Sequence, residues 1–570
     1  MELKRLALAI GISCAIFLGW NFLAQHMGWL PAPPAPVAQN ATTPVAQNAT
    51  APVAQPNDPG SAAVSAPAGD PSATSTPPAF VPTEGRLVTV ETPLYRAVFH
   101  SGGGILRQFY LKKYHTSLRP DSPMVNMVSE LAAGQAPMGL LVNGQPTWVG
   151  ASWALEGDNL TLGADGAGSL RFVTEIDGVR ITRQLSFSGA TYVIDEKLHL
   201  SSATPRTANV AFTFGASPLA VNETPSILSR LSHKIKGGPE PAAEESSYNL
   251  TRVAWLQNDK FDEDHSANDL IAGKLVQGKV SWMAVMNNYF MGAVSMRGAD
   301  ASAKGSLINN VYHVLIGKTG LALSNTDTTL DCSYFVGPKE TKQLAGTPND
   351  LKKALDYGLF SFIAKPLLML LAFFHSYAHN YGVAIILLTV VIKILFWPLS
   401  QKSYKSMQQM KQLQPLIVKI REKYADDKET MNREIMQLYK TYKVNPAGGC
   451  LPILIQIPVF FGLYQALLNA IELRHAPFIS TLPFTNMPWL ADLASPDPLL
   501  ITPLVMGATM FLQQKMTPAP GDPTQAKVMM LMPLIFTVLF INFPSGLVVY
   551  WLINNVISIG QQWMQLRRTA

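Results

Sequence analysis

Long apolar runs are concentrated in the C-terminal third of the chain, and one further run lies near its start. The runs cover 6–23, 381–398, about 450–471, 498–513, 528–543 and 545–563. Most of them approach the ~20 apolar residues that an α-helix needs to cross a bilayer. The pattern therefore predicts a membrane α-helical bundle with six spans, five of which form a C-terminal core over residues 377–570.

The first run has two interpretations, a cleaved signal peptide or a membrane anchor. It follows Lys4 and Arg5, and its 18 residues are long for the core of a signal peptide. Trp20 lies near its outer end, where interfacial aromatic residues gather. We expect an uncleaved transmembrane anchor over residues 1–26.

The next 320 residues, roughly, show no helical periodicity of any length. Residues 27–83 are rich in Pro and Ala, repeat PVAQNAT, and are expected to form a disordered linker. Within 84–345, apolar and polar residues alternate on both sides of Asp177-Gly178, which predicts a β-hairpin. We expect one large all-β sandwich there.

An amphipathic segment at 349–376 joins the β region to the core. Leu351, Leu355, Leu359 and Phe362 fall on one helical face, with lysines elsewhere, as in helices that lie in a membrane interface. A further span at 358–375 would move every later loop to the opposite side of the membrane and would place the most positively charged loop outside. We therefore do not expect a span there.

Positive charges in the short loops predict the orientation. The segment 399–446 carries ten Lys and Arg residues, whereas the opposite loop, 472–497, has only Arg474. Both termini are then cytoplasmic and the β domain lies outside. Two apolar stripes predict that 399–446 is a cytoplasmic helical hairpin. Its methionines, Met407, Met410, Met431 and Met436, could adapt to varied apolar partners, or the stripes could face each other or the lipid surface.

The amino-acid composition agrees with a membrane protein, and the sequence contains no motif typical of a catalytic, metal or nucleotide site. Charged residues make up 14% of the chain, against about 25% in soluble domains, and the mean hydropathy is +0.14. Cys14, Cys332 and Cys450 form no zinc, redox or disulfide pattern, and there is no P-loop. We expect no catalytic residue, no metal and no cofactor.

Lys393 is the candidate functional residue, because a charge inside an apolar span is costly and usually functional. The alternative is that it extends to the nearby cytoplasmic interface. Thr389, Gln456 and Asn554 are polar groups at similar depth, which could line a cavity or only join helices by hydrogen bonds. Tyr550 and Trp551 could line the same cavity or serve in packing.

Three long segments resemble the YidC/Oxa/Alb insertase family in its Gram-negative form. They are IKILFWPLSQKSYKSMQQMKQLQPLI at 392–417, KVNPAGGCLPILIQIPVFFGLYQAL at 443–467 and FPSGLVVYWLINNVISIGQQ at 543–562. The resemblance implies a periplasmic β-supersandwich similar to sugar-mutarotase folds, and a core in the bacterial inner membrane. It further implies a membrane protein insertase and chaperone, which moves nascent membrane proteins from the cytoplasm through a hydrated groove, alone or with the Sec translocon.

The resemblance also implies site residues and partners. Lys393 aligns with a groove arginine of the family; a lysine keeps the charge but loses the bidentate fork, which suits a point charge. Thr389, Gln456 and Trp551 align with groove positions, with Tyr550 and Asn554 beside them. The implied partners are nascent membrane proteins, Sec translocon subunits and membrane lipids, with the ribosome as a further candidate. The short end QLRRTA gives no reason to expect nucleic-acid binding.

Two other functions remain compatible with the residues alone. A polytopic transporter or channel would also carry charged and polar groups in its spans, although no internal repeat is visible. A membrane-tethered periplasmic sugar enzyme would need a catalytic cluster in the β domain. His100, His199, Asp195 and Glu196 are explained by alternating exposure along strands.

Overall fold

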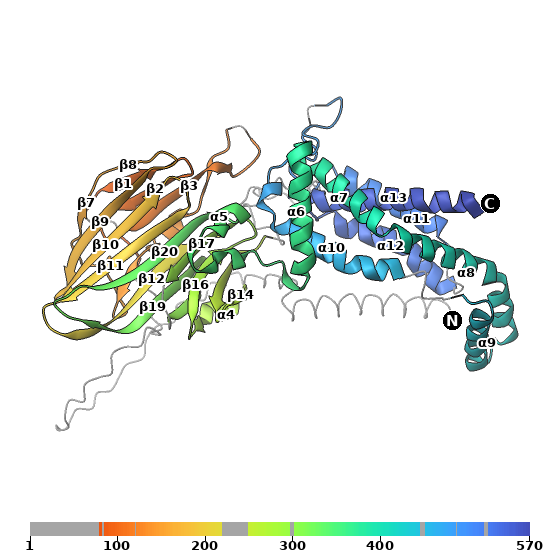
Figure 1. Ribbon diagram of the computed structural model, residues 1–570, viewed down its shortest axis with the longest axis horizontal. Helices are drawn as coiled ribbons and strands as arrows, with labels where there is room; N and C mark the ends of the chain where they lie inside the picture. The colour runs from red at the N-terminus through yellow and green to blue at the C-terminus, as the bar shows by residue number, and fades with distance from the viewer. Residues whose placement is uncertain are drawn as a thin grey trace, which may run out of the picture.

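The computed structural model describes residues 79–81, 85–119, 121–218, 249–296, 301–444, 451–485, 487–517 and 523–569. The expected anchor at 1–26 and nearly all of the expected linker at 27–83 lie outside the described residues, as do Cys14 and Cys450. A β region and a helical region lie end to end (Figure 1). The expected division into a β-sheet domain and a helical membrane region is confirmed.

The β domain is built on one nine-stranded sheet, all of whose pairings are antiparallel. Its strands, in spatial order, are β14 (Lys260–Asp264), β13 (Arg252–Gln257), β16 (Val280–Met286), β17 (Phe290–Met296), β20 (Thr328–Pro338), β11 (Val193–Ser202), β10 (Val179–Ser188), β9 (Ala167–Ile176) and β7 (Ala154–Glu156). The predicted hairpin is present as β9 and β10, joined by Asp177 and Gly178 at positive φ.

Two smaller sheets complete the domain. The five-stranded sheet has the order β4 (Met124–Asn126), β3 (Ile105–His115), β2 (Tyr95–His100), β1 (Leu87–Glu91) and β8 (Leu160–Thr161). The six-stranded sheet has the order β15 (Lys274–Val276), β18 (Ser302–Ile308), β19 (Val311–Leu323), β12 (Arg206–Ala216), β5 (Leu140–Val142) and β6 (Gln145–Pro146). In the part of the domain that the structure describes, three short helices lie among them: α2 (Glu130–Ala133), α4 (Ala267–Ala272) and α5 (Thr341–Ala345).

Both smaller sheets pack on one face of the large sheet. Phe99 of the five-stranded sheet meets Phe187 edge-on, with ring centroids 5.6 Å apart, while Phe214 of the six-stranded sheet fills the space above Gly292. Strand register places Phe187 and Gly292 on the same face. The resulting interior is one large apolar core, beside which a smaller cluster forms around Phe80 and Trp148.

A fully buried ion pair lies within this core. Arg183 of β10 and Glu196 of β11 make two hydrogen bonds, of 2.7 and 2.9 Å, and both side chains are 0% exposed. Arg183 also donates to the carbonyls of Gly103 and Met138, which precede strands of the two smaller sheets. Burial alone would lower the pKa of Arg183, but the Glu196 carboxylate raises it overall. Arg183 thus joins three sheets, and Glu196 is a structural residue that supplies its counter-charge.

Among the described residues, the helical region contains eight longer helices and three short 3-10 segments. They are η1 (Pro348–Ala354), η2 (Gly358–Phe360), α6 (Ser361–Ala378), α7 (Tyr381–Leu395), α8 (Trp397–Lys423), α9 (Lys428–Thr441), α10 (Leu451–Asn469), η4 (Ile471–Leu473), α11 (Ile501–Met516), α12 (Pro523–Phe540) and α13 (Ser545–Thr569). Helices therefore occupy each of the five core segments predicted as spans. The helix α6 stands steeply across the ends of α7, α10 and α13 (Figure 1).

Length and hydropathy do not confirm the expected number of spans. Among the described residues, one helix, Gly358–Ala378, is long and apolar enough by itself to cross a membrane. The α7–α8 pair passes the same test only as a unit bent by 62°, and 455–469 and 529–540 are shorter apolar helices. The segment that we expected to lie in the interface is thus the one that satisfies the criterion for a span.

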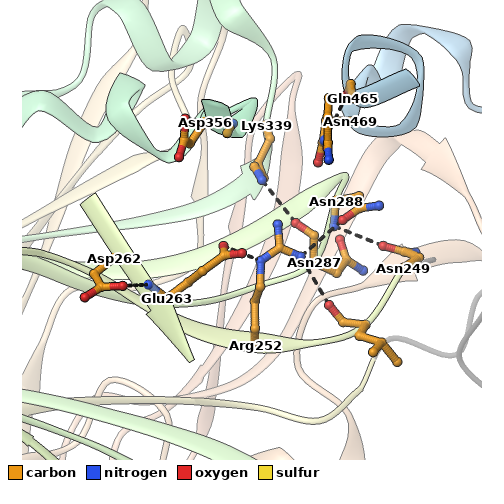
Figure 2. Close-up of polar contacts among 12 residues, drawn as sticks. Asn249, Arg252, Asp262, Glu263, Asn287, Asn288, Lys339, Asp356, Gln465 and Asn469 are labelled. Carbon is orange, nitrogen blue, oxygen red and sulfur yellow. Dashed lines mark hydrogen bonds and ion pairs between the residues drawn. The ribbon is translucent and has the colours of Figure 1, made fainter. Parts of the chain in front are cut away.

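The connector between the two regions is packed rather than loose. Leu344, Leu351 and Ala354 are buried in the β core, and Tyr357 packs with Ala364 of α6 and Ala466 of α10. The loop Asn287–Asn288 touches α10 directly, because the Asn288 amide lies 3.5 Å from the Leu468 carbonyl. Figure 2 shows Asn288 facing the end of α10 that carries Gln465 and Asn469. The β domain is therefore seated on one end of the helical bundle.

Candidate functional site

Lys393 lies inside the bundle rather than on its lipid-facing side. The apolar residues that α7 exposes are Val383, Leu387, Val391, Ile394 and Leu395, whereas its buried face carries Leu388, Thr389, Ile392 and Lys393. The Lys393 side chain is 8% exposed. Because the lysine is on the inner face, its charge is directed toward neighbouring helices and away from acyl chains.

The Lys393 ammonium binds α13. Its Nζ donates to Ser558 Oγ over 2.7 Å, and Ser558 Oγ in turn donates to the Asn554 carbonyl one turn earlier. The Tyr404 hydroxyl of α8 donates to the Ser558 carbonyl over 3.4 Å. Among the described residues, Lys393 forms no ion pair with a carboxylate, so the charge of its ammonium is compensated only by neutral groups.

A second polar contact lies beside the first. Gln456 of α10 donates through Nε2 to Asn554 Oδ1 over 2.6 Å. The contact brings α10 to the same stretch of α13 that Lys393 binds. Two of the predicted polar residues are therefore paired with each other, one helical turn from the residue that receives the lysine.

These contacts belong to one polar face of α13. Asn554, Ser558, Gln561 and Gln565 are spaced by four, three and four residues, which places them on the same side of a helix. The face leads from the Gln456 contact, past Lys393, toward the C-terminal end of the chain. We call these four residues the polar face of α13.

A small cavity lies at the C-terminal end of this face. It is lined by Trp397, Ser400 and Tyr404 of α8 and by Gln561, Met564 and Gln565 of α13, among others. Its volume is about 20 Å³, enough for one water or one polar group of similar size. None of its lining residues is charged. The cavity continues the polar face beyond Lys393.

The remaining predicted site residues serve mainly in packing. The Thr389 hydroxyl donates to the Ile385 carbonyl of its own helix over 2.7 Å. Tyr550 is 1% exposed within the bundle core. Trp551 lies among Phe460, Phe536 and Phe540, with centroid distances of 4.9, 6.1 and 5.3 Å. All three lie one or two turns from the Lys393 contacts without joining them.

The hairpin of α8 and α9 packs on itself. Met410, Leu416 and Ile417 of α8 meet Ile435, Leu438 and Tyr439 of α9. Asp427 caps α9 by accepting from Glu429 N and Thr430 N at 3.1 and 3.0 Å, and its contacts with Thr430 lower the pKa of its carboxyl. Met436 is 51% exposed, and Met407 and Met431 are half-buried. The two stripes therefore largely face each other, one of the alternatives that the sequence left open.

Sequence reasoning missed Ser558 and Gln561. A serine in a helix often bonds only to its own backbone, as Ser558 also does, so its type gives no signal. The spacing of polar residues through an otherwise apolar segment was the available signal, and it points to the same face as Asn554.

Comparisons with known proteins agree with this architecture. A family model described as "YidC periplasmic domain" matches residues 87–370, and one described as "60Kd inner membrane protein" matches residues 373–570. The boundary between the two falls within α6, next to the observed junction of β domain and bundle.

Curated relatives match the chain along its whole length. Proteins named membrane protein insertase YidC are 53% identical in Nitratidesulfovibrio vulgaris (strain DP4) and in Oleidesulfovibrio alaskensis, covering 100% of both chains in each case. The protein of that name in Lawsonia intracellularis is 47% identical with the same coverage.

Solved structures are more distant. A YidC insertase crystal structure with its first transmembrane domain resolved is 18% identical, covering 85% of this chain and 94% of that one, with a TM-score of 0.34. A putative aldose 1-epimerase from Escherichia coli K12 covers 44% of this chain with a TM-score of 0.27. Scores this low carry no argument, and the assignment rests on the full-length relatives. The chain belongs to the YidC family of membrane protein insertases.

Proposed function

We propose that a membrane protein undergoing insertion (the passenger) moves along the polar face of α13, with Lys393 attracting acidic residues in its polar tail. One observation carries the proposal: a buried ammonium on the inner side of α7 has a serine hydroxyl as its hydrogen-bond partner. A charge buried without a counter-charge is costly, and such charges in membrane segments usually serve function. A passenger carboxylate would supply the missing counter-charge.

The polar face shortens the distance over which the passenger's polar tail must cross hydrocarbon without hydrogen-bond partners. A polar segment in hydrocarbon leaves its backbone groups unpaired, at several kcal/mol each. Gln456, Asn554 and Ser558 offer side-chain donors and acceptors at this depth. The apolar helix of the passenger then moves into lipid, and its burial there drives the step without a nucleotide.

The charge distribution supports an orientation with the β domain in the periplasm, both termini in the cytoplasm and α6 in the outer interface. The α8–α9 hairpin holds most of the positive charge of the core, including Lys405, Lys411 and Lys419. Arg474, on the opposite side, is only 9% exposed and donates to the His115 carbonyl over 2.7 Å. Because Arg474 binds the β domain, its positive charge is not free on the outer side. The difference in positive charge between the two sides of the core, on which the positive-inside rule depends, is therefore larger.

The same orientation assigns partners to surfaces. Nascent passengers and the ribosome would approach from the side of the hairpin, whose charged outer face surrounds the apolar contacts between α8 and α9. The Sec translocon and membrane lipids would meet the apolar sides of the core, where α12 exposes Leu534 and Val538. A sugar-enzyme role is not favoured, because Glu196 is sealed in the core with Arg183.

Insertion by the full chain in lipid vesicles tests the role of the charge. The passenger is a single-span protein with an acidic tail. Lys393→Arg should keep most of the activity, whereas Lys393→Glu should lower the insertion rate at least about tenfold. Opposite charges 4 Å apart interact by about 4 kcal/mol at an effective dielectric of 20, and each ~1.4 kcal/mol is a factor of ten in rate.

Lys365→Glu is the matched control, because it makes the same charge change at an exposed position of α6, outside the hairpin and the polar face of α13. It should insert the passenger as the unaltered chain does. Equal rates for Lys393→Arg and Lys393→Glu would refute the proposal.

A further inference from the structure

The amide of Gln561 is buried without a partner at the cavity that ends the polar face of α13. The residue is 6% exposed, and neither Nε2 nor Oε1 has a hydrogen-bond partner in the part of the chain that the structure describes. A buried polar group left unpaired costs about 1–3 kcal/mol, and this side chain holds two. A partner that the described chain does not supply therefore completes these hydrogen bonds, a water when no other molecule is bound or a polar group of a molecule that enters the cavity.

The chemistry of the cavity restricts what that partner can be. A side-chain amide offers N–H donors and a C=O acceptor side by side, which matches the N–H and C=O that one residue of an extended chain directs to the same side. The lining has no positive charge for a phosphate or carboxylate, and the volume of about 20 Å³ admits one polar group of about the size of a water. The edge of a peptide backbone fits both restrictions.

Position supports the same partner. Gln561 lies three residues after Ser558, about 4.5 Å along the helix from the residue that binds Lys393. A tail whose acidic residue reaches Lys393 would pass Gln561, and Trp397 and Met564 would border its side chains.

We propose that Gln561 binds the main chain of the passenger's extended tail, pairing its side-chain amide with the N–H and C=O of one residue at the end of the polar face. This inference rests on the proposed function, since it needs a passenger on that face. Backbone pairing is independent of sequence, so it would let one site hold tails of any composition while Lys393 selects for acidic ones.

An amide-to-ester scan tests the pairing without altering the chain. Synthetic single-span passengers with a short acidic tail carry one ester bond at successive tail positions, which removes one N–H and weakens one C=O. With the full chain in vesicles of phosphatidylethanolamine and phosphatidylglycerol, we expect insertion to slow about 3- to 10-fold at one or two adjacent ester positions, the loss typical of one or two hydrogen bonds.

Gln561→Leu, which keeps the bulk and removes both polar atoms, should slow the all-amide passenger similarly and abolish the ester effect. Gln437→Leu, on the exposed side of α9, is the matched control and should retain both the rate and the ester effect. Thermal unfolding in detergent checks that each variant is folded.

The outcomes separate this inference from the proposed function. An ester effect of equal size in the unaltered chain and in Gln561→Leu would overturn the backbone pairing. So would the absence of any ester effect while Lys393→Glu still impairs insertion, and in that case the charge role stands. A defect of Gln561→Leu that disappears when phosphatidylglycerol is omitted would assign the cavity to a lipid headgroup instead, which also overturns the inference.

Discussion

The guanidinium of Arg474 lies over the ring of Phe290, 5.4 Å from its centroid, and so joins the loop after α10 to strand β17. The same side chain donates to the His115 carbonyl at the end of β3. Arg474 therefore touches two sheets of the β domain from the membrane core. Together with the Asn288–Leu468 contact, it fixes how the domain sits on the bundle.

Arg474→Leu should loosen this seating. The variant loses a hydrogen bond from a charged donor, worth about 1.5–3 kcal/mol, and a cation–π contact. Distances between a spin label in the β domain and one in the core should broaden. Arg206→Leu is the control, because Arg206 donates to the Asp177 carbonyl within the β domain and does not reach the bundle. Unchanged distance distributions in Arg474→Leu would mean that other contacts suffice.

Glu196→Gln should destabilise the β domain strongly. Removal of one partner from a buried ion pair leaves an uncompensated charge and costs about 3–5 kcal/mol. The exposed pair Arg171–Glu156 provides the comparison, and Glu156→Gln should cost no more than about 1 kcal/mol. Chemical denaturation followed by the fluorescence of Trp282, which is 0% exposed in the same core, measures both. Similar costs for the two variants would contradict a structural role for the buried pair.

Lys339, at the base of the β domain, should make stability depend on pH (Figure 2). Burial, with a smaller effect of Arg252, lowers its pKa to about 7, against opposing effects of Glu263 and Asp356. Its Nζ donates to the Asn287 carbonyl over 3.2 Å. Between pH 7 and about 10 the unfolded chain holds this proton and the folded chain does not, so stability rises with pH across that window.

Lys339→Met removes the titrating group. Relative to the unaltered chain, it should be most stabilised at pH 7 or below, and the difference should shrink as the pH approaches 10. Thermal unfolding of the full chain in detergent measures this, with the exposed Lys342→Met as control. A difference that does not change with pH would show that Lys339 stays protonated in the folded chain.

Crosslinking from two sides of α7 should distinguish the inner face from the lipid face. Thr389 is 0% exposed on the side of Lys393, whereas Val391 is 40% exposed on the opposite side. A photoreactive residue at 389 should capture a passenger halted during insertion, and one at 391 should capture mainly lipid. Stronger capture of the passenger at 391 would place the route on the outer side of α7.

The sequence predicted which regular elements form and which polar residues face the interior, but it did not predict the contacts between them. Alternation and turn residues were sufficient for the β9–β10 hairpin, because a two-residue Asp-Gly turn imposes its own geometry. The inward positions of Gln456, Asn554 and Lys393 follow from the high cost of polar groups in lipid. That cost says which residues turn inward but not which neighbour each one meets.

Other features depended on tertiary packing and escaped prediction. In the sequence, Glu196 resembled an exposed strand residue, because a charged residue at an alternating position usually faces solvent. Here that position faces the core, where Arg183 is its partner. Ser558 became informative only when the structure placed Lys393 against it. The number of spans is not recoverable from hydropathy, because the apolar helices 455–469 and 529–540 are shorter than the ~20 residues that a span usually needs.

The packed connector has a mechanical consequence. Between the end of β20 and the start of α6, Leu344, Leu351 and Tyr357 are each anchored, the first two in the β core and the third against α6 and α10. A protein that binds the outer surface of the β domain and exerts force on it would therefore also move α10, the helix that carries Gln456. Such a protein could change the shape of the route for the passenger without ever touching the membrane.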